Sequence, residues 1–313
     1  MKNIVIIGGG TGTSLVLQGL KKYPVHLSAV VSTADDGGST GRLRQQFGGV
    51  PVGDIRACLL ALSNALPIVN EQMAYRNKNG HVTLNIALAQ YQKALGINAA
   101  ISHVSKFLKV KGNVVPVTLS PTTLSATLEN GQVIKGEHNI DEPKHNTGLA
   151  IKKLKLQPSG PANPKALEVI RKADMIVFSP GDLYTSVLPN ILVKDLAKAI
   201  KRSSAVKVMV VNTFAKRGQT HGYKISDFIA TLEQYLETNI DVVIVNTEKP
   251  KVSQQGFAFI KADLSGVRQD VKIIAKPLLS RKFFKKNKSD KLQRSKQRHD
   301  SEKLAKIIYK LVN

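Results

Sequence analysis

The chain opens with a buried strand, a glycine-rich turn and a helix, and this order limits the folds that it can adopt. A strand is predicted at 3–7, where Ile4 to Ile7 are apolar and β-branched, residues 8–14 are GGGTGTS, and leucines then recur at helical spacing to about Lys22. Strand and helix patterns alternate in the same way along most of the 313 residues. The sequence therefore predicts an α/β fold with a Rossmann-like, doubly wound and mostly parallel sheet between layers of helices.

The other elements of this sheet are expected from short apolar runs and from helical periodicity. Further strands are predicted at 27–32, 175–178, 207–211, 241–245 and 271–275. A C-terminal helix is predicted because Leu304, Ile307 and Ile308 recur at helical spacing. The remaining helices are predicted at 54–65, 84–95, 97–108, 163–173, 188–201 and 226–236.

Residues 113–157 differ from the rest, because they contain short β-branched segments separated by turn residues. The dipeptide Asn130-Gly131 is typical of a tight hairpin turn between two such segments. We expect a small antiparallel β insertion over 113–157. The predicted organisation is one Rossmann-like domain over 1–313, with this insertion and with a basic linker plus C-terminal helix over 281–313.

The chain is strongly basic, and its composition limits the classes of partner. It has 46 Lys and Arg against 22 Asp and Glu, and nine of the basic residues lie within 281–300. Such a field attracts phosphorylated ligands and other anions. There is no Trp, aromatic residues make up 5%, and no basic stretch alternates with stacking side chains, so we do not expect nucleic acid as a partner.

The sequence also argues against membrane and secreted classes. No apolar run approaches the 18 residues of a spanning helix, and the first residues lack the features of a signal peptide. The lone Cys58 excludes a disulfide framework. We therefore expect a cytoplasmic protein with no membrane span.

The turn after the first strand is the first candidate binding segment. Backbone N–H groups and the helix dipole attract an anion at such a position. The segment fits the start of a dinucleotide fingerprint, but Thr13 occupies the place of its last glycine, and the lysine of a P-loop is absent. It predicts a phosphate or dinucleotide site without choosing between them. The candidate residues are Gly8, Gly9, Gly10, Thr11, Gly12 and Thr13.

A second candidate segment, TADDGGSTGRLR at 33–44, follows the second strand and should lie at the same edge of the sheet. Carboxylates suit Mg²⁺, and arginines suit bidentate contact with phosphate. We predict metal ligands at Asp35, Asp36 and Asp54, although Asp54 could instead be only a helix cap. One of the paired aspartates should face the metal while the other bonds N–H groups of its own turn. The phosphate candidates are Gly37, Gly38, Ser39, Thr40, Arg42 and Arg44.

Loops after later strands extend the same predicted crevice. The segment SPGDLYTS at 179–186 and the residue after strand 207–211 add Gly181, Thr185, Ser186 and Asn212. His81 follows an Asn-Gly turn and could also enter the site.

The start of the C-terminal helix completes the predicted site. Asp300 can cap this helix, and Glu302 suits its first turn. A helix start needs no arginine before its cap, so we predict that the helix packs against the sheet and brings Arg298 to the crevice as a phosphate or sugar clamp. Ser301 is then a candidate phosphorylation site, because phosphate is favoured at a helix N-terminus.

Taken in order, these motifs resemble one protein family over essentially the whole chain. The motifs are GGGTGTS (8–14), STADDGGSTGRLR (32–44), PVGDIRACL (51–59), GH (80–81), NP (163–164), SPGDLYTSVLPNILV (179–193), VNT (211–213), DVVIVNT (241–247) and RHD (298–300). They resemble the 2-phospho-L-lactate transferase superfamily and, within it, the bacterial gluconeogenesis-factor branch.

The resemblance implies a ligand at the carboxyl edge of a Rossmann-like sheet. Transferases of this superfamily move a phospholactyl group from a guanine-nucleotide-linked donor to a deazaflavin, with Mg²⁺ held by aspartates. The gluconeogenesis-factor branch is linked to central carbon metabolism, cell-wall precursor supply and cell shape, and it binds a UDP-sugar such as UDP-N-acetylglucosamine. By position, 8–13 and 39–44 match the phosphate-binding segments, and the three aspartates named above match the metal side.

Departures from the family pattern leave three functions open. SPGDLY replaces the family's G-P-G-S-L-Y, and Gln219 replaces an acidic residue, which weakens an inherited transferase activity. The first hypothesis is a nucleotide-sugar-binding regulator that needs no organic cofactor and has protein partners in cell-wall regulation. The second is a Mg²⁺-dependent transferase acting on a nucleotide-diphosphate donor, and a weaker third is an NAD(P)-binding protein. We expect a homo-oligomer in each case.

Overall fold

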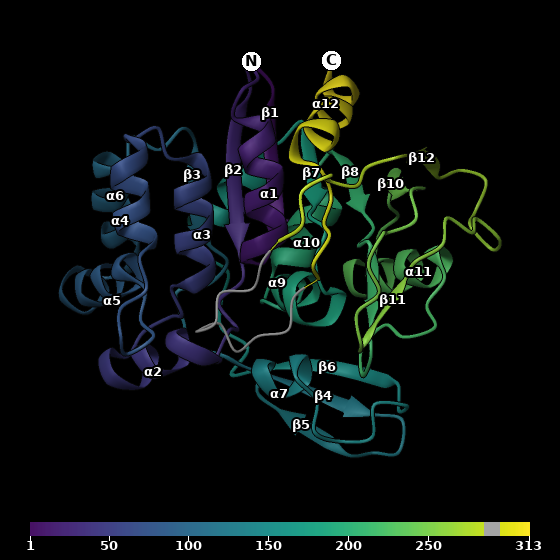
Figure 1. The fold of residues 1–313 in the computed structure, drawn as a ribbon, viewed down its shortest axis with the longest axis horizontal. Helices are drawn as coiled ribbons and strands as arrows, with labels where there is room; N and C mark the ends of the chain where they lie inside the picture. Colours follow the sequence, from purple (N-terminus) through teal and green to yellow (C-terminus); the bar gives the residue numbers. More distant parts are fainter. Residues whose placement is uncertain (285–294) are drawn as a thin grey trace.

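A seven-stranded parallel sheet forms the centre of the computed structural model, which describes residues 1–284 and 295–313 (Figure 1). The strand order is β12-β10-β8-β7-β1-β2-β3, and every neighbouring pair is parallel. The chain builds outward from β1 in one direction and then from β7 in the other, so the predicted doubly wound α/β fold is confirmed. The strands are β1 (Asn3–Gly8), β2 (His26–Val31), β3 (Asn113–Pro116), β7 (Met175–Phe178), β8 (Val206–Val210), β10 (Val242–Asn246) and β12 (Lys272–Lys276).

The two faces of the sheet bury separate apolar cores. Val5 and Ile7 of β1 pack into one core, while Ile4 and Ile6 pack into the other. Side chains alternate between the faces of a strand, so a strand covered on both sides must be apolar throughout. This requirement explains why the sheet strands appear in the sequence as continuous apolar runs.

Helices cover both faces. One face carries α1 (Gly10–Leu20), α3 (Gly53–Leu62), α5 (Thr83–Leu95), α6 (Ile97–Phe107) and α12 (Ser301–Val312). The other carries α8 (Pro164–Arg171), α9 (Leu188–Ile191), α10 (Leu196–Arg202) and α11 (Ile225–Leu236). The single helix predicted at 188–201 is two helices, because Asp195 adopts a left-handed conformation with φ of 69°. None of the helices in the described part of the chain is long and apolar enough to cross a membrane.

A three-stranded antiparallel sheet forms the expected insertion, but it begins later than predicted. It consists of β4 (Thr123–Leu128), β5 (Val133–Lys135) and β6 (Ile151–Gln157), with the short helix α7 (Glu137–Asp141) between the last two. Residues 113–116 instead form β3, the edge strand of the main sheet, in parallel with β2. A four-residue strand such as β3 does not reveal its neighbour, whereas residues 154–157 of β6 alternate between buried and exposed, as in a sheet with one covered face. The insertion lies at the carboxyl end of the main strands (Figure 1).

The C-terminal helix packs along α1. Asp300 caps it by accepting bonds from the backbone N–H groups of Glu302 and Lys303, as predicted. The two helices meet closely at Gly19, where an added Cβ would lie 2.1 Å from the carbonyl oxygen of Ser301. This packing holds the residues just before α12 at the edge of the sheet.

Several smaller elements were not predicted from the sequence. They are α2 (Gly38–Phe47), α4 (Pro67–Ala74), a π-helical turn η1 (Leu183–Val187), and the strand pair β9 (Phe214–Lys216) and β11 (Phe257–Phe259).

Candidate functional site

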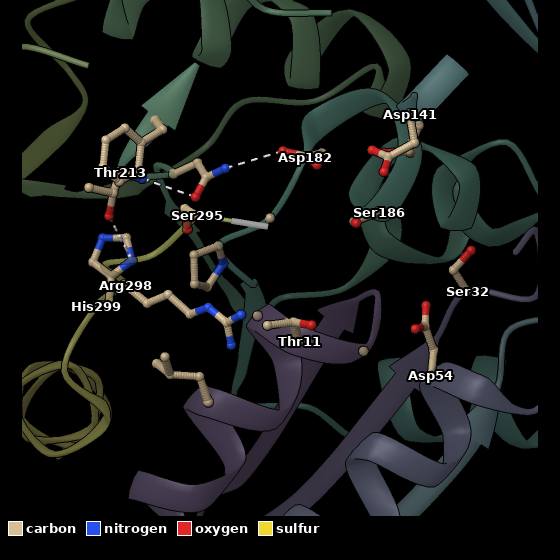
Figure 2. Close-up of a pocket in the computed structure, with 18 of the residues that line it drawn as sticks. Thr11, Ser32, Asp54, Asp141, Asp182, Ser186, Thr213, Ser295, Arg298 and His299 are labelled. Atoms are coloured by element: carbon tan, nitrogen blue, oxygen red, sulfur yellow. Dashed lines mark hydrogen bonds between the residues drawn. The ribbon is translucent and has the colours of Figure 1, made fainter. Parts of the chain in front are cut away.

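A pocket lies at the carboxyl ends of β1, β7 and β8, where the strand order reverses (Figure 2). Ligands of open α/β sheets bind in such a crevice because the loops on either side diverge there. Seven chain segments meet around it, together with α7 of the insertion. The lining residues include Gly10, Thr11, Gly12, Ser32, Asp35, Asp54, Glu137, Asp141, Gly181, Asp182, Thr185, Ser186, Asn212, Thr213, Phe214, Phe257, Ser295, Arg298 and His299.

The N-terminus of α1 forms one wall of the pocket. Its N-cap is Gly9, which has no side chain to bond the N–H groups of the first turn. Gly12 is required by a close approach, because a Cβ there would lie 1.4 Å from the carbonyl oxygen of Pro180. Of the predicted residues, 10–12 line the pocket, while Gly8, Gly9 and Thr13 lie behind it. Buried Thr13 joins the two loops through its hydroxyl, 2.9 Å from that of Ser179.

The loop after β7 forms the adjoining wall, as predicted. Gly181, Thr185 and Ser186 all line the pocket, and Asn212 after β8 joins them. The side chain of Asn212 donates a hydrogen bond of 3.4 Å to a carboxylate oxygen of Asp182. These four placements agree with the expectation from strand order, because the carboxyl ends of neighbouring parallel strands bring their loops together.

The α2 segment does not line the pocket, contrary to expectation. Gly37, Gly38, Ser39, Thr40, Arg42 and Arg44 are all absent from its walls. Arg42 donates to the backbone oxygen of Asn79 at 3.1 Å, and the hydroxyl of Ser39 lies 2.9 Å from Nδ1 of His81. Burial, and then the charges of Arg42 and Arg76, lower the pKa of His81. The helix that starts at Gly38 carries these side chains toward residues 75–81, and His81 also stays outside the pocket.

The paired aspartates divide their roles differently from the prediction. Asp35 lines the pocket, and it is also the residue that bonds its own turn, accepting from Gly37 N–H at 2.9 Å. Asp36 is not part of the pocket lining, and its two carboxylate oxygens accept from the backbone N–H groups of Glu137 and His138, at 3.2 and 2.9 Å. Asp36 therefore anchors the insertion, and it lies outside the pocket lining that contains the other two predicted metal ligands.

Acidic residues that the sequence did not single out extend the wall around Asp35 and Asp54. Glu137 and Asp141 come from α7 of the insertion, and Asp182 comes from the β7 loop. Burial, together with the nearby carboxylates of Asp35, Asp141, Asp54 and Asp36, raises the pKa of Glu137 well above its usual range. No local motif marks Glu137 and Asp141, whereas Asp182 lies within the SPGDLYTS segment that was predicted to border the crevice.

A buried lysine balances part of this negative charge. Nζ of Lys216, a residue 5% exposed, lies 2.7 Å from Oδ1 of Asp141, 3.7 Å from Asp182 and 3.9 Å from Glu142. Burial lowers the pKa of this ammonium, but the attraction of the three carboxylates outweighs burial and holds it above its usual value. Lys216 thus joins β9, the insertion and the β7 loop.

Two of the three predicted magnesium ligands, Asp35 and Asp54, line the pocket, whereas Asp36 does not. Across residues 1–284 and 295–313, no three His, Cys, Asp or Glu side chains are arranged to hold a metal ion. Asp36 is bonded to backbone, and the carboxylates of Asp141 and Asp182 already face the ammonium of Lys216. Asp35 and Asp54 line the same pocket, and a pair of carboxylates together with phosphate oxygens and water is a usual set of ligands for Mg²⁺.

The segment before α12 closes the pocket. Arg298 lines it, as expected, and its guanidinium is directed toward Thr11 at the start of α1 (Figure 2). The guanidinium carbon also lies 4.1 Å from the centre of the Phe284 ring. His299, which the sequence did not single out, is 3% exposed, and burial lowers its pKa to about 4, so its imidazole is neutral at physiological pH.

Comparisons with known proteins agree with the resemblance of the motifs. The model of the family 2-phospho-L-lactate transferase CofD matches residues 4–279. A gluconeogenesis factor of Halalkalibacterium halodurans is 42% identical over 79% of this chain and 78% of its own length. A Thermotoga maritima relative is 36% identical over 98% of both chains.

A solved structure shows the same fold. The crystal structure of a Bacillus halodurans protein superimposes with a TM-score of 0.88 and 34% identity, covering 98% of this chain and 99% of that one. The family model spans both the glycine turn of β1 and the β7 loop, which are the elements that build the pocket. The chain belongs to the 2-phospho-L-lactate transferase CofD family, and the relatives that it matches over most of its length carry the name gluconeogenesis factor.

Proposed function

We propose that the pocket binds a nucleotide sugar of the UDP-N-acetylglucosamine type, and that the protein is a cytoplasmic regulator linking central carbon metabolism to cell-wall precursor supply and cell shape. The observation that carries the proposal is that the glycine-rich N-terminus of α1 and the guanidinium of Arg298 line the same pocket. Backbone N–H groups, a helix dipole and a bidentate guanidinium together suit a diphosphate. Homologues named gluconeogenesis factor support the metabolic part of the proposal.

Outside the part of the pocket proposed for the diphosphate, the lining suits a sugar better than a further phosphate group. Five carboxylates line it, those of Asp35, Asp54, Glu137, Asp141 and Asp182. Carboxylates accept hydrogen bonds from sugar hydroxyls and amide N–H groups, but they repel phosphate oxygens. A nucleotide-linked sugar satisfies both parts of the pocket at once.

A Mg²⁺-dependent transferase is the second candidate. The observation in its favour is the raised pKa of Glu137, which reflects its burial and then the nearby carboxylates of Asp35 and Asp54 among others. Perturbed carboxyl groups in a cleft are typical of functional sites. The chain would then need a nucleotide-diphosphate donor and an acceptor in the same crevice.

A thermal-shift panel distinguishes these functions. The ligands are UDP-N-acetylglucosamine, GDP, GTP, NADH and NADPH, each with and without Mg²⁺. A ligand at about 100 times its Kd stabilises the folded protein by about 2.7 kcal/mol. We expect the UDP-sugar to raise Tm without Mg²⁺. A response to guanine nucleotides that depends on Mg²⁺ would favour the transferase, and a response to the nicotinamide cofactors alone would contradict both functions.

A further inference from the structure

The two ends of the pocket differ in charge and polarity, and this difference affects the orientation in which a ligand binds. Figure 2 shows Thr213, Arg298 and His299 at one end, which we call the arginine end. Asp54 and Asp141 lie toward the other, which we call the carboxylate end, with Thr11 between the two. A ligand with a charged centre and two unlike ends can fit such a pocket in only one direction.

The arginine end suits a flat heterocyclic base next to phosphate. Phe214 follows Thr213 in the chain and lines the pocket, and its ring centre lies 6.3 Å from that of Phe257, which is itself 5.9 Å from the ammonium of Lys216. Nδ1 of His299 lies 3.5 Å from the hydroxyl of Thr213, while Nε2 is buried and has no hydrogen-bond partner in the described part of the chain. Leaving a buried polar nitrogen unbonded is costly, so a group that supplies a partner is favoured there.

The carboxylate end suits a neutral group rich in hydroxyl and amide donors. Among the described residues, Oδ1 of Asp141 accepts hydrogen bonds from Thr185 Oγ1 at 3.3 Å and from Gln219 Nε2 at 3.1 Å. The same oxygen forms an ion pair with Lys216 Nζ at 2.7 Å. These contacts fix the carboxylate group and leave its second oxygen, Oδ2, to accept a bond from a ligand.

Lys216 fixes the carboxylate end as a whole. Its ammonium lies between Asp141 of the insertion and Asp182 of the β7 loop. The lysine itself is not part of the pocket lining, so it acts through these carboxylates. A buried ammonium with several carboxylates around it holds their relative positions, since removal of either sign leaves an uncompensated charge.

We propose that a nucleotide sugar binds in one orientation, with its base toward His299, its diphosphate between Arg298 and the N-terminus of α1, and its sugar on Asp141. Asp141 then discriminates the sugar-bearing ligand from the bare nucleotide, and Lys216 is a positioning residue for it. The inference rests on the proposed function, because it takes the ligand class from there and adds which end of the pocket receives the sugar.

The test compares two ligands that differ only in the sugar. Isothermal titration of the full chain with UDP and with UDP-N-acetylglucosamine gives the ratio of their Kd values. Replacing Asp141→Asn should weaken the UDP-sugar about tenfold or more, since a bond to a charged acceptor is lost, and should change the Kd of UDP less than about twofold. Lys216→Gln should shift the same ratio in the same direction.

Glu142→Gln is the matched control. It removes the same charge 3.9 Å from Lys216, but Glu142 does not line the pocket, so the ratio should stay at the wild-type value. Equal weakening of both ligands by Asp141→Asn, or an equal effect of Glu142→Gln, overturns the orientation. If the wild type binds neither UDP nor the UDP-sugar, the proposed function itself fails and the orientation with it. Should Lys216→Gln not fold, the Asp141 comparison still decides the question.

Discussion

Two glycine-rich turns follow neighbouring strands of the sheet, yet the glycines of only one of them line the pocket. The turn after β1 leads into α1, the turn after β2 leads into α2, and both helices have a glycine N-cap with no side-chain hydrogen bond. The first turn of α1 faces the pocket, whereas α2 faces the loop of residues 75–81. A glycine-rich helix N-terminus is therefore a ligand site only where other loops meet it.

The length of the connection explains the difference. Helix α1 starts at Gly10, two residues after β1 ends at Gly8, so its N-terminus stays at the edge of the sheet. Helix α2 starts at Gly38, seven residues after β2 ends at Val31. The intervening residues include Asp36, which is bonded to the first residues of α7, and the helix that follows contacts residues 79–81.

Two glycine substitutions give the largest expected contrast. Gly12→Ala places a Cβ 1.4 Å from the carbonyl oxygen of Pro180, so it should lower the free energy of unfolding by about 3 kcal/mol and abolish ligand binding. Gly38→Ala meets no atom within 4 Å, but its φ of 49° is strained for alanine, so it should cost about 1 kcal/mol. Urea denaturation measures both. Similar losses for the two variants would show that the α1 turn is not held against the β7 loop.

Two arginine substitutions test the same contrast through binding. Arg298→Ala should weaken UDP binding by about 2 kcal/mol, because a charge-assisted contact to phosphate is lost. Arg42→Ala removes a bond to the backbone oxygen of Asn79 and should leave the affinity unchanged. Titration calorimetry gives the affinities, and Tm reports stability. A loss of affinity in the Arg42 variant at unchanged Tm would show that α2 does take part in ligand binding.

Two aspartate substitutions should separate anchoring from binding with smaller effects. Asp36→Asn weakens the bonds to Glu137 and His138 N–H, so it should lower the free energy of unfolding by about 1 kcal/mol with little change in affinity. Asp54→Asn alters a pocket-lining carboxylate and should change affinity more than stability. The pair is measured by denaturation and by UDP-sugar titration. The opposite pattern would mean that Asp36 contacts the ligand.

Much of the fold could be predicted because buried parallel strands are apolar on both faces. The segment 175–178 was predicted as a strand and forms β7 with the same bounds. Helix α2 was missed because glycines and polar residues hide its weak apolar face. The start of the insertion was misplaced because β3 is short and its partner strand, β2, lies some 80 residues earlier in the chain.

Some residues of the site could be predicted from their neighbours in the sequence, and others depend on contacts between distant parts of the chain. Glycines and small polar residues directly after strands, such as Gly12 and Ser186, could be placed at the pocket from strand order alone. Asp141, Lys216 and His299 could not, because no local pattern distinguishes a buried acid, lysine or histidine from one on the surface. The N-cap role of Asp300 was predictable, since capping depends on neighbours within one turn.

The sequence by itself determined the alternation of strand and helix, the glycine turn of α1 and the cap of α12, because each depends on contacts within a few residues. Only the tertiary structure decided that Asp36 anchors the insertion, that α2 turns away from the pocket, and that Lys216 balances Asp141. Hydrogen bonds and ion pairs of this kind join residues up to about a hundred positions apart, and their strength depends on distance and burial, which chain order does not encode.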